Sequence, residues 1–104
     1  MSCVTVEPPR HLEAPVTGRA RDVLERWVWL RIPKGQATTW HVLGYRRRDG
    51  VPYVTSPLVA ADPASHKVKT TSGSTYLLEW QSEVLDMRLN SHLWEALRVW
   101  KVES

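Results

Sequence analysis

Hydrophobic and polar residues alternate in short runs through the middle of the chain, with turn residues between the runs. Residues 27–32 form the clearest run, and a period of two is typical of a β-strand. The alternation assigns the side chains to two faces: Val28, Leu30 and Ile32 on one, and Trp27, Trp29 and Arg31 on the other. Because both faces carry large apolar residues, we expect both to need cover.

Further runs of the same kind follow. Residues 33–35 form a turn, residues 38–46 read as a second strand, and residues 48–50 turn the chain again. Residues 51–59 are extended but contain Pro52 and Pro57, which favours an edge strand or a bulged crossing. A turn over residues 62–65 leads into residues 66–71, which we expect to be paired with the strand that follows them.

Residues 68–80 predict a β-hairpin. β-Branched and aromatic residues flank Ser72-Gly73-Ser74, and glycine adopts a positive φ without steric cost. On the second strand the period of two places Tyr76, Leu78 and Trp80 on one face, which we expect to face the core.

Beyond residue 80 the period changes. Leu85, Leu89, Leu93 and Leu97 lie four apart, as on an amphipathic helix. We expect a helix over about residues 91–98, and the alternation of residues 85–89 and 97–102 leaves strands open as an alternative there. The predicted fold is therefore α+β: a small antiparallel sheet of about five strands, arranged as a meander or SH3-like barrel, with a C-terminal helical segment.

A chain of 104 residues suits a single domain. Three prolines in residues 1–18 predict an extended N-terminal arm, and residues 19–104 then form the domain, with a short helix over residues 19–26 capped by Thr17. No apolar run approaches the roughly 20 residues of a membrane span, and residues 1–18 lack the apolar region of a secretory signal. We expect no membrane association and a cytoplasmic location in a bacterial host.

Candidate chemistry is sparse. Cys3 is the single cysteine, so one chain cannot form a disulfide or a cysteine-based zinc site. His11, His41, His66 and His92 are widely separated, and no phosphate-binding loop or nucleophile motif is found. Ser72-Gly73-Ser74 precedes a strand rather than the helix of a nucleophile elbow. We therefore predict no catalytic residues, no metal, no cofactor and no enzyme activity.

Charge is unevenly distributed. The net charge is +3, but residues 26–78 carry eight Lys or Arg against two Asp, and residues 79–104 carry three against five acidic residues. A basic sheet suits a phosphate backbone or an acidic protein surface, and a solvated surface is the simpler alternative. The densest positive charge is Arg46-Arg47-Arg48 at a predicted hairpin tip, and Lys67 and Lys69 share one strand face.

Six tryptophans and no phenylalanine occur in the chain. Trp40, Trp80 and Trp94 are expected to fill the core. Trp27 and Trp29 share a face with Arg31, so they are either an exposed pair suited to a protein partner or to base stacking, or a second packed face. The predicted partner-binding residues are Trp27, Trp29, Arg31, Arg46, Arg47, Arg48, Lys67 and Lys69.

Residues 54–59, Asp62 and residues 68–78 together resemble a recurring element of small accessory proteins of phages and bacterial mobile elements. The element is two strands and a Ser-Gly-Ser turn in about a quarter of the chain, and it contains no ligand residues. The resemblance implies a setting in which short proteins bind and block a host machine, as anti-CRISPR proteins do.

Two functions follow as hypotheses. The first is a non-catalytic, anti-CRISPR-like inhibitor that occludes a host protein complex, such as a nucleic-acid-binding effector. The second is a small DNA- or RNA-binding SH3-like barrel whose basic residues neutralise phosphates. A homodimer through the predicted helix, which carries Leu93, Trp94, Leu97 and Trp100, is compatible with both.

Overall fold

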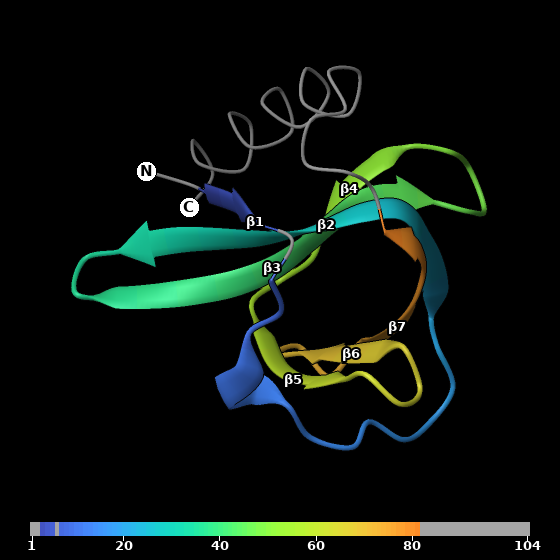
Figure 1. The fold of residues 1–104 in the computed structure, drawn as a ribbon. Helices are drawn as coiled ribbons and strands as arrows, with labels where there is room; N and C mark the ends of the chain where they lie inside the picture. The colour runs from blue at the N-terminus through green and yellow to red at the C-terminus, as the bar shows by residue number, and fades with distance from the viewer. Residues whose placement is uncertain (1–2, 6, 82–104) are drawn as a thin grey trace.

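A single curled β-sheet accounts for most of the computed structural model, which describes residues 3–5 and 7–81 (Figure 1). Its elements in chain order are β1 (Cys3–Thr5), the 3₁₀ turn η1 (Arg10–Leu12), β2 (Asp22–Lys34), β3 (Ala37–Arg46), β4 (Pro52–Val54), β5 (Leu58–Asp62), β6 (Lys67–Thr70) and β7 (Thr75–Gln81). The strand order is β4-β3-β2-β7-β6-β5, and β1 pairs with β2 outside this path.

The long strand β2 organises the sheet because its two edges hold three partners. One edge pairs antiparallel with β3 from Leu24 to Lys34. The other edge pairs first with β7, in parallel, and then with β1, antiparallel at Trp29 to Arg31. β1 and β7 therefore follow one another along the same edge of β2.

A bulge in β2 separates these two halves. The β2–β3 register shifts between Glu25 and Val28, and Arg26 adopts a left-handed φ of 50°. Gly44 of β3 lies against the bulge: a Cβ atom at Gly44 would lie 2.9 Å from Trp27 Cβ and 3.1 Å from the Glu25 carbonyl oxygen. Only glycine fits this close approach without moving backbone.

The segment between β4 and β5 closes the curl by binding back to β3. Thr55 is fully buried; its backbone N–H donates to the Val42 carbonyl (2.9 Å), and its hydroxyl accepts from the Val42 N–H (2.9 Å). His41 Nδ1 contacts the Thr55 carbonyl oxygen at 2.8 Å, which requires a proton on that nitrogen. Buried His41 is thus a hydrogen-bonded core residue, and it joins β3 to the segment that leads into β5.

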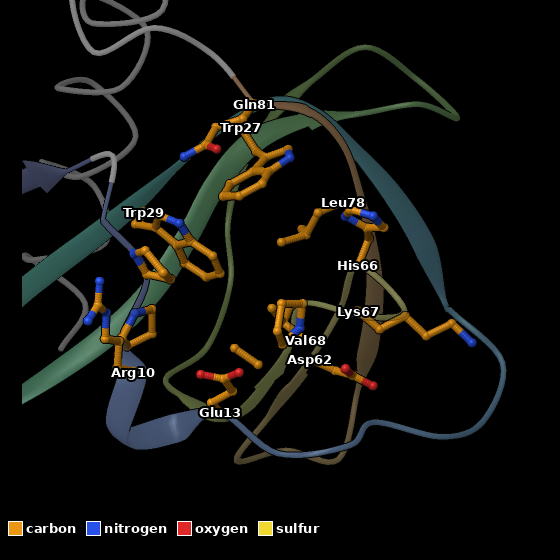
Figure 2. A pocket seen from close by; sticks show the side chains of 14 residues that line it. Arg10, Glu13, Trp27, Trp29, Asp62, His66, Lys67, Val68, Leu78 and Gln81 are labelled. Carbon is orange, nitrogen blue, oxygen red and sulfur yellow. The ribbon is translucent and has the colours of Figure 1, made fainter.

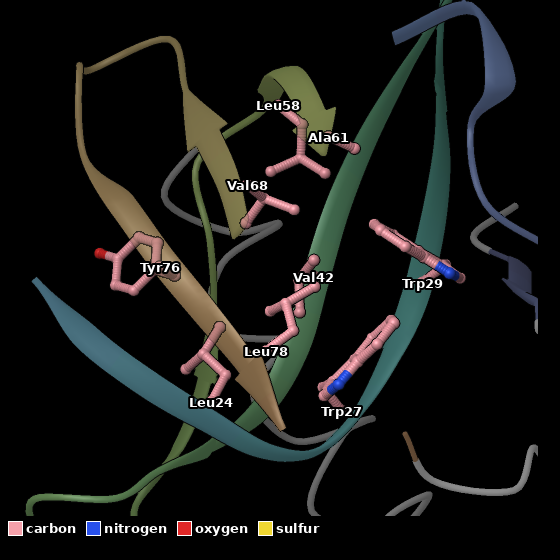
Figure 3. Packing of buried hydrophobic residues seen from close by; sticks show 9 residues of the cluster. All are labelled: Leu24, Trp27, Trp29, Val42, Leu58, Ala61, Val68, Tyr76 and Leu78. Atoms are coloured by element: carbon pink, nitrogen blue, oxygen red, sulfur yellow. The ribbon is translucent and has the colours of Figure 1, made fainter. Parts of the chain in front are cut away.

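Two apolar clusters lie on opposite faces of β2 and β3. The larger one fills the inside of the curl (Figure 3) and consists of Leu24, Trp27, Trp29, Val42, Leu58, Ala61, Val68, Tyr76 and Leu78. The smaller one lies on the other face and consists of Val28, Leu30, Ile32 and Leu43. The alternation in residues 27–32 thus predicted both faces correctly, and both are buried as expected.

The predicted fold class is wrong. The described residues contain seven strands, one 3₁₀ turn and no α-helix, and the sheet is mixed because β2 and β7 are parallel. The α+β assignment and the purely antiparallel sheet are both incorrect. Residues 19–26 form no helix, since β2 begins at Asp22. The C-terminal helix predicted over residues 91–98 lies outside the described residues, as do Trp94 and Trp100.

Other local predictions are confirmed. β3 and the β6–β7 hairpin form where expected, with Gly73 at a φ of 87° in the turn, and Pro52 lies in the edge strand β4. Tyr76 and Leu78 face the core, but Trp80 is 71% exposed. The reason is a left-handed φ of 54° at Trp80, which interrupts the alternation of the strand.

No helix within the part of the chain that the structure describes is long and apolar enough to cross a membrane.

Replacing Gly44 by alanine should destabilise the protein, because the new methyl group would force the β2 bulge away from β3. We expect a loss of about 1–3 kcal/mol in the free energy of unfolding, the usual effect of overpacking. Chemical denaturation measures it, with exposed Thr38→Ala on the same strand as control. Equal stability of the two variants would show that the close approach does not constrain the fold.

Candidate functional site

An aromatic pocket of about 320 Å³ lies inside the curled sheet (Figure 2). Its apolar walls come from four strands, β2, β5, β6 and β7, and from the N-terminal arm: Trp27, Trp29, Ala61, Val68, Leu78, Pro8 and Pro9. The lining is completed by Pro63 and by charged and polar residues: Arg10, Glu13, Asp62, His66, Lys67 and Gln81. We call these residues together the aromatic pocket.

The two tryptophans form one corner of the pocket. They are two positions apart on β2, so both point inward, and their ring centroids lie 4.7 Å apart at an interplanar angle of 79°. Trp27 is only 8% exposed and Trp29 only 7%, so of the two alternatives for this face, an exposed pair and a second packed face, the packed face is correct. The bulge before Trp27 and the curl of the sheet turn this face inward, where the indoles bound a cavity.

Asp62 holds the N-terminal arm against the pocket. Its Oδ2 accepts hydrogen bonds from the Val16 backbone N–H (3.0 Å) and the Ser65 hydroxyl (2.8 Å), and its Oδ1 accepts from the Ala64 N–H (3.0 Å). The bond from Val16, followed by that from Ser65, lowers the pKa of the Asp62 carboxyl below its ordinary value. The arm is also fastened by the Ala14 N–H, which donates to the Ala61 carbonyl at 3.2 Å.

The arm therefore supplies one wall of the pocket. Pro9 is fully buried, Val16 is 5% exposed, and Leu12 packs against the inner cluster. Lys67 fastens the chain on the other side of the pocket, because its ammonium donates to the Gly18 carbonyl at 2.8 Å. This bond links β6 to the segment that enters β2.

The arginines of the β3–β4 turn do not form one patch. Arg46 pairs with Asp49 at 2.9 Å and its guanidinium lies 5.2 Å from the Tyr53 ring centroid. Arg47 instead forms ion pairs with Glu25 of β2 and Glu79 of β7. Because successive side chains point to opposite sides, Arg47 is separated from its two neighbours.

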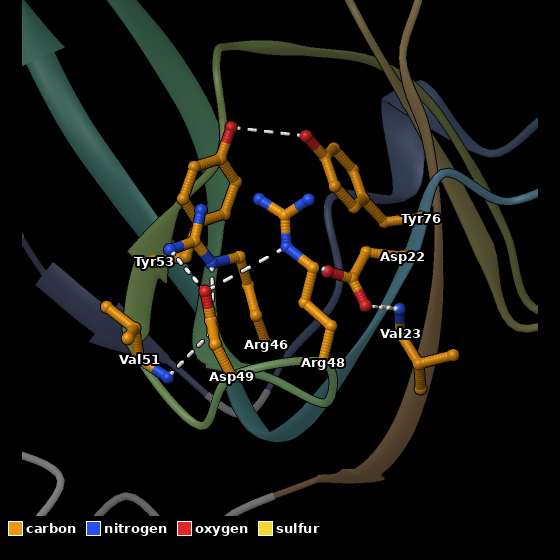
Figure 4. A network of polar contacts seen from close by, with 8 residues as sticks. All are labelled: Asp22, Val23, Arg46, Arg48, Asp49, Val51, Tyr53 and Tyr76. Carbon is orange, nitrogen blue, oxygen red and sulfur yellow. Dashed lines mark hydrogen bonds and ion pairs between the residues drawn. The ribbon is translucent and has the colours of Figure 1, made fainter.

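Arg46 and Arg48 line a second, smaller cavity of about 100 Å³, which we call the arginine cleft (Figure 4). Its other lining residues are Arg21, Asp22, Tyr53 and Tyr76. A hydrogen bond from the Val51 N–H, together with the nearby arginines, lowers the pKa of Asp49. The Tyr53 and Tyr76 hydroxyl oxygens lie 3.1 Å apart, and burial, followed by this hydrogen bond, raises the pKa of Tyr76 to about 12.

The predicted binding residues thus fall into separate places. Trp27, Trp29 and Lys67 line the aromatic pocket, whereas Arg46 and Arg48 line the arginine cleft. Arg47 is engaged on the opposite side of the turn, and Arg31 and Lys69 are exposed residues that line neither cavity. The structure does not bring these residues together into one surface.

Sequence reasoning missed the contributions of distant residues. Pro8, Pro9, Arg10 and Glu13 reach the pocket from the arm, and Arg21, Asp22, Tyr53 and Tyr76 meet in the cleft. One local signal was present: the run from Asp62 to Ser65 is typical of a turn in which an aspartate accepts backbone bonds. It does not indicate that the arm would supply a further donor.

Among the described residues that line the two cavities there is no serine, cysteine or threonine. Within residues 3–5 and 7–81, no group of three or more His, Cys, Asp or Glu side chains is placed to hold a metal ion. No protein-family model matches the chain, and no curated protein or solved structure is significantly similar to it.

Asp62→Asn should loosen the arm and change how stability depends on pH. The pKa of Asp62 in the folded protein is below its unfolded value of 3.8. The ionised carboxylate therefore stabilises the folded protein fully above pH 3.8, and this stabilisation is lost as the pH falls through the folded pKa. We expect the variant to be less stable at neutral pH and less sensitive to acid below about pH 4.

Denaturation curves at neutral and acidic pH measure both effects. Glu13→Gln is the control, since it removes a carboxylate from the same pocket and leaves the Val16 bond intact. If the two variants lose the same stability at every pH, Asp62 is not the anchor of the arm.

Proposed function

We propose that the protein is a non-catalytic binding protein whose aromatic pocket accepts an apolar side chain of a partner protein. The observation that carries this proposal is the corner formed by Trp27 and Trp29, buried inside an apolar wall and bordered by charged residues. Protein interfaces concentrate binding energy in such desolvated pockets, and a polar rim excludes water around them.

The size and lining of the pocket favour this occupant. About 320 Å³ lies at the lower end of the range for small-molecule sites and suffices for one large side chain. The apolar walls come from five separate segments, so the cavity is held by the whole fold rather than by one loop. A lining without a serine, cysteine or threonine nucleophile supports binding rather than turnover.

We infer that the protein acts as a steric inhibitor of a host complex. A compact protein seated on a host complex through one anchored side chain would block whatever that surface normally binds. The proposal includes a mobile-element origin, an anti-CRISPR-like role and a location in the bacterial cytoplasm. These parts of it rest on the sequence element at residues 54–78.

The alternative of a nucleic-acid-binding barrel has less support. Its stacking residues, Trp27 and Trp29, are buried, and Lys67 and Arg47 already bind groups of the protein itself. Arg46 and Arg48 remain the residues best placed to meet a phosphate.

Ala61→Met should abolish binding by filling the pocket. Ala61 is 6% exposed and lines the cavity, so a flexible methionine there occupies the space that the partner side chain needs. We expect at least a tenfold loss of affinity, which is about 1.4 kcal/mol. Folding should survive, because filling an existing cavity adds contacts without removing any.

The control is Val59→Met, which introduces the same residue on the same strand at a position that is 47% exposed. Tagged parent and variants are compared in pull-downs from nuclease-treated bacterial lysate, with quantitative mass spectrometry and thermal unfolding. A protein that Val59→Met retains and Ala61→Met loses supports the proposal. A partner retained equally by both folded variants would show that binding occurs elsewhere.

A further inference from the structure

The arginine cleft is a second site that the proposed function does not use. Three arginines, Arg21, Arg46 and Arg48, line a cavity of about 100 Å³ together with Tyr53, Tyr76 and Asp22. Arg21 precedes β2, whereas Arg46 ends β3 and Arg48 lies in the turn after it, so the fold itself assembles the cluster. Positive charge exceeds negative charge there, even with Asp49 beside Arg46 and Arg48.

Arg48 presents its guanidinium to the cleft. Both of its ion pairs with described residues use Nε, at 3.4 Å from Asp22 Oδ2 and 3.8 Å from Asp49 Oδ2. Figure 4 shows the guanidinium extending between the rings of Tyr53 and Tyr76, with its terminal nitrogens toward the two hydroxyls. A planar fork in this position suits an oxyanion, which it can bind through two parallel hydrogen bonds.

The tyrosine pair supplies a neutral donor. With its pKa raised to about 12, Tyr76 keeps its proton at neutral pH. When the Tyr76 hydroxyl donates to the Tyr53 hydroxyl across 3.1 Å, the Tyr53 proton is available to a ligand in the cleft.

Asp22 gives the cleft an unusual acceptor. Its side chain is only 10% exposed; Oδ1 accepts from the Val23 N–H at 2.7 Å, while Oδ2 is buried and accepts no hydrogen bond from the described residues. The contact with Arg48 is an ion pair without hydrogen-bond geometry. A buried carboxylate oxygen that accepts no hydrogen bond is costly, so a ligand in the cleft should donate one to it. An anion without a proton cannot do this.

We propose that the arginine cleft binds a terminal phosphate group that carries one proton. The arginines and the tyrosine donor bind its charged oxygens, and its remaining P–OH donates to Asp22 Oδ2. Inorganic phosphate keeps at least one proton near neutral pH, whereas sulfate keeps none; a phosphate monoester, whose second pKa is about 6, keeps one only in its monoanionic form. The cleft is only about 100 Å³ in volume, so a nucleobase or sugar attached to the phosphate stays outside.

The test is calorimetric titration of the full chain, at constant ionic strength, with inorganic phosphate, glycerol phosphate and sulfate. We expect inorganic phosphate to bind at least tenfold more tightly than sulfate. Binding of glycerol phosphate as well assigns the cleft to phosphate monoesters, and its failure assigns the cleft to free phosphate. No binding of phosphate, or equal binding of sulfate, would overturn the proposal.

Three variants locate the site. Arg48→Ala should weaken phosphate binding at least tenfold, whereas Arg47→Ala removes the adjacent charge on the other side of the turn and should leave binding unchanged. Asp22→Asn should abolish the preference for phosphate over sulfate, because the amide can donate to an unprotonated oxygen. Equal losses in Arg47→Ala and Arg48→Ala, or a preference that persists in folded Asp22→Asn, would contradict the assignment.

Discussion

The close approach of Gly44 to Trp27 is the constraint on which the rest of the structure depends. At this point β3 carries no side chain, so the bulged backbone of β2 can press against it and bend at Arg26. β2 pairs with β7 up to Trp27, directly after the bend, and with β1 from Trp29 to Arg31. The two indoles that follow it form a corner of the aromatic pocket. A steric rule at one glycine thus sets both the sheet topology and the shape of the cavity.

Short acidic side chains then organise the positive charge of the sheet. Asp49 pairs with Arg46, and Asp22 lies against Arg48. The basic residues are consequently not a diffuse coat, since several are committed to particular oxygen atoms of the protein itself. The positive charge that remains for a ligand is confined to places where several hydrogen-bond donors converge. This arrangement favours recognition of a defined chemical group over general attraction to negative charge.

The sequence predicted the strands better than their arrangement. A period of two tells which face a side chain occupies, so the inward positions of Tyr76 and Leu78 and the two faces of β2 were accessible. It does not tell which edge pairs with which strand, and the parallel β2–β7 contact was therefore missed. Trp80 was assigned to the wrong side because alternation assumes an extended backbone, and its φ is left-handed. The arm contacts and the arginine cleft depend on residues far apart in the chain, for which local patterns carry no signal.

The parallel pairing of β2 with β7 has a consequence for how the chain reaches this structure. Asp22 pairs with Tyr76, more than fifty residues later, whereas the β2–β3 and β6–β7 hairpins join near neighbours. Closing so long a loop costs more chain entropy than closing a hairpin, so the hairpins have the kinetic advantage. The aromatic pocket, which needs Trp27 from one hairpin and Leu78 from the other, comes into existence only when the two units dock. A partially folded chain with both hairpins formed would therefore still lack its binding cavity.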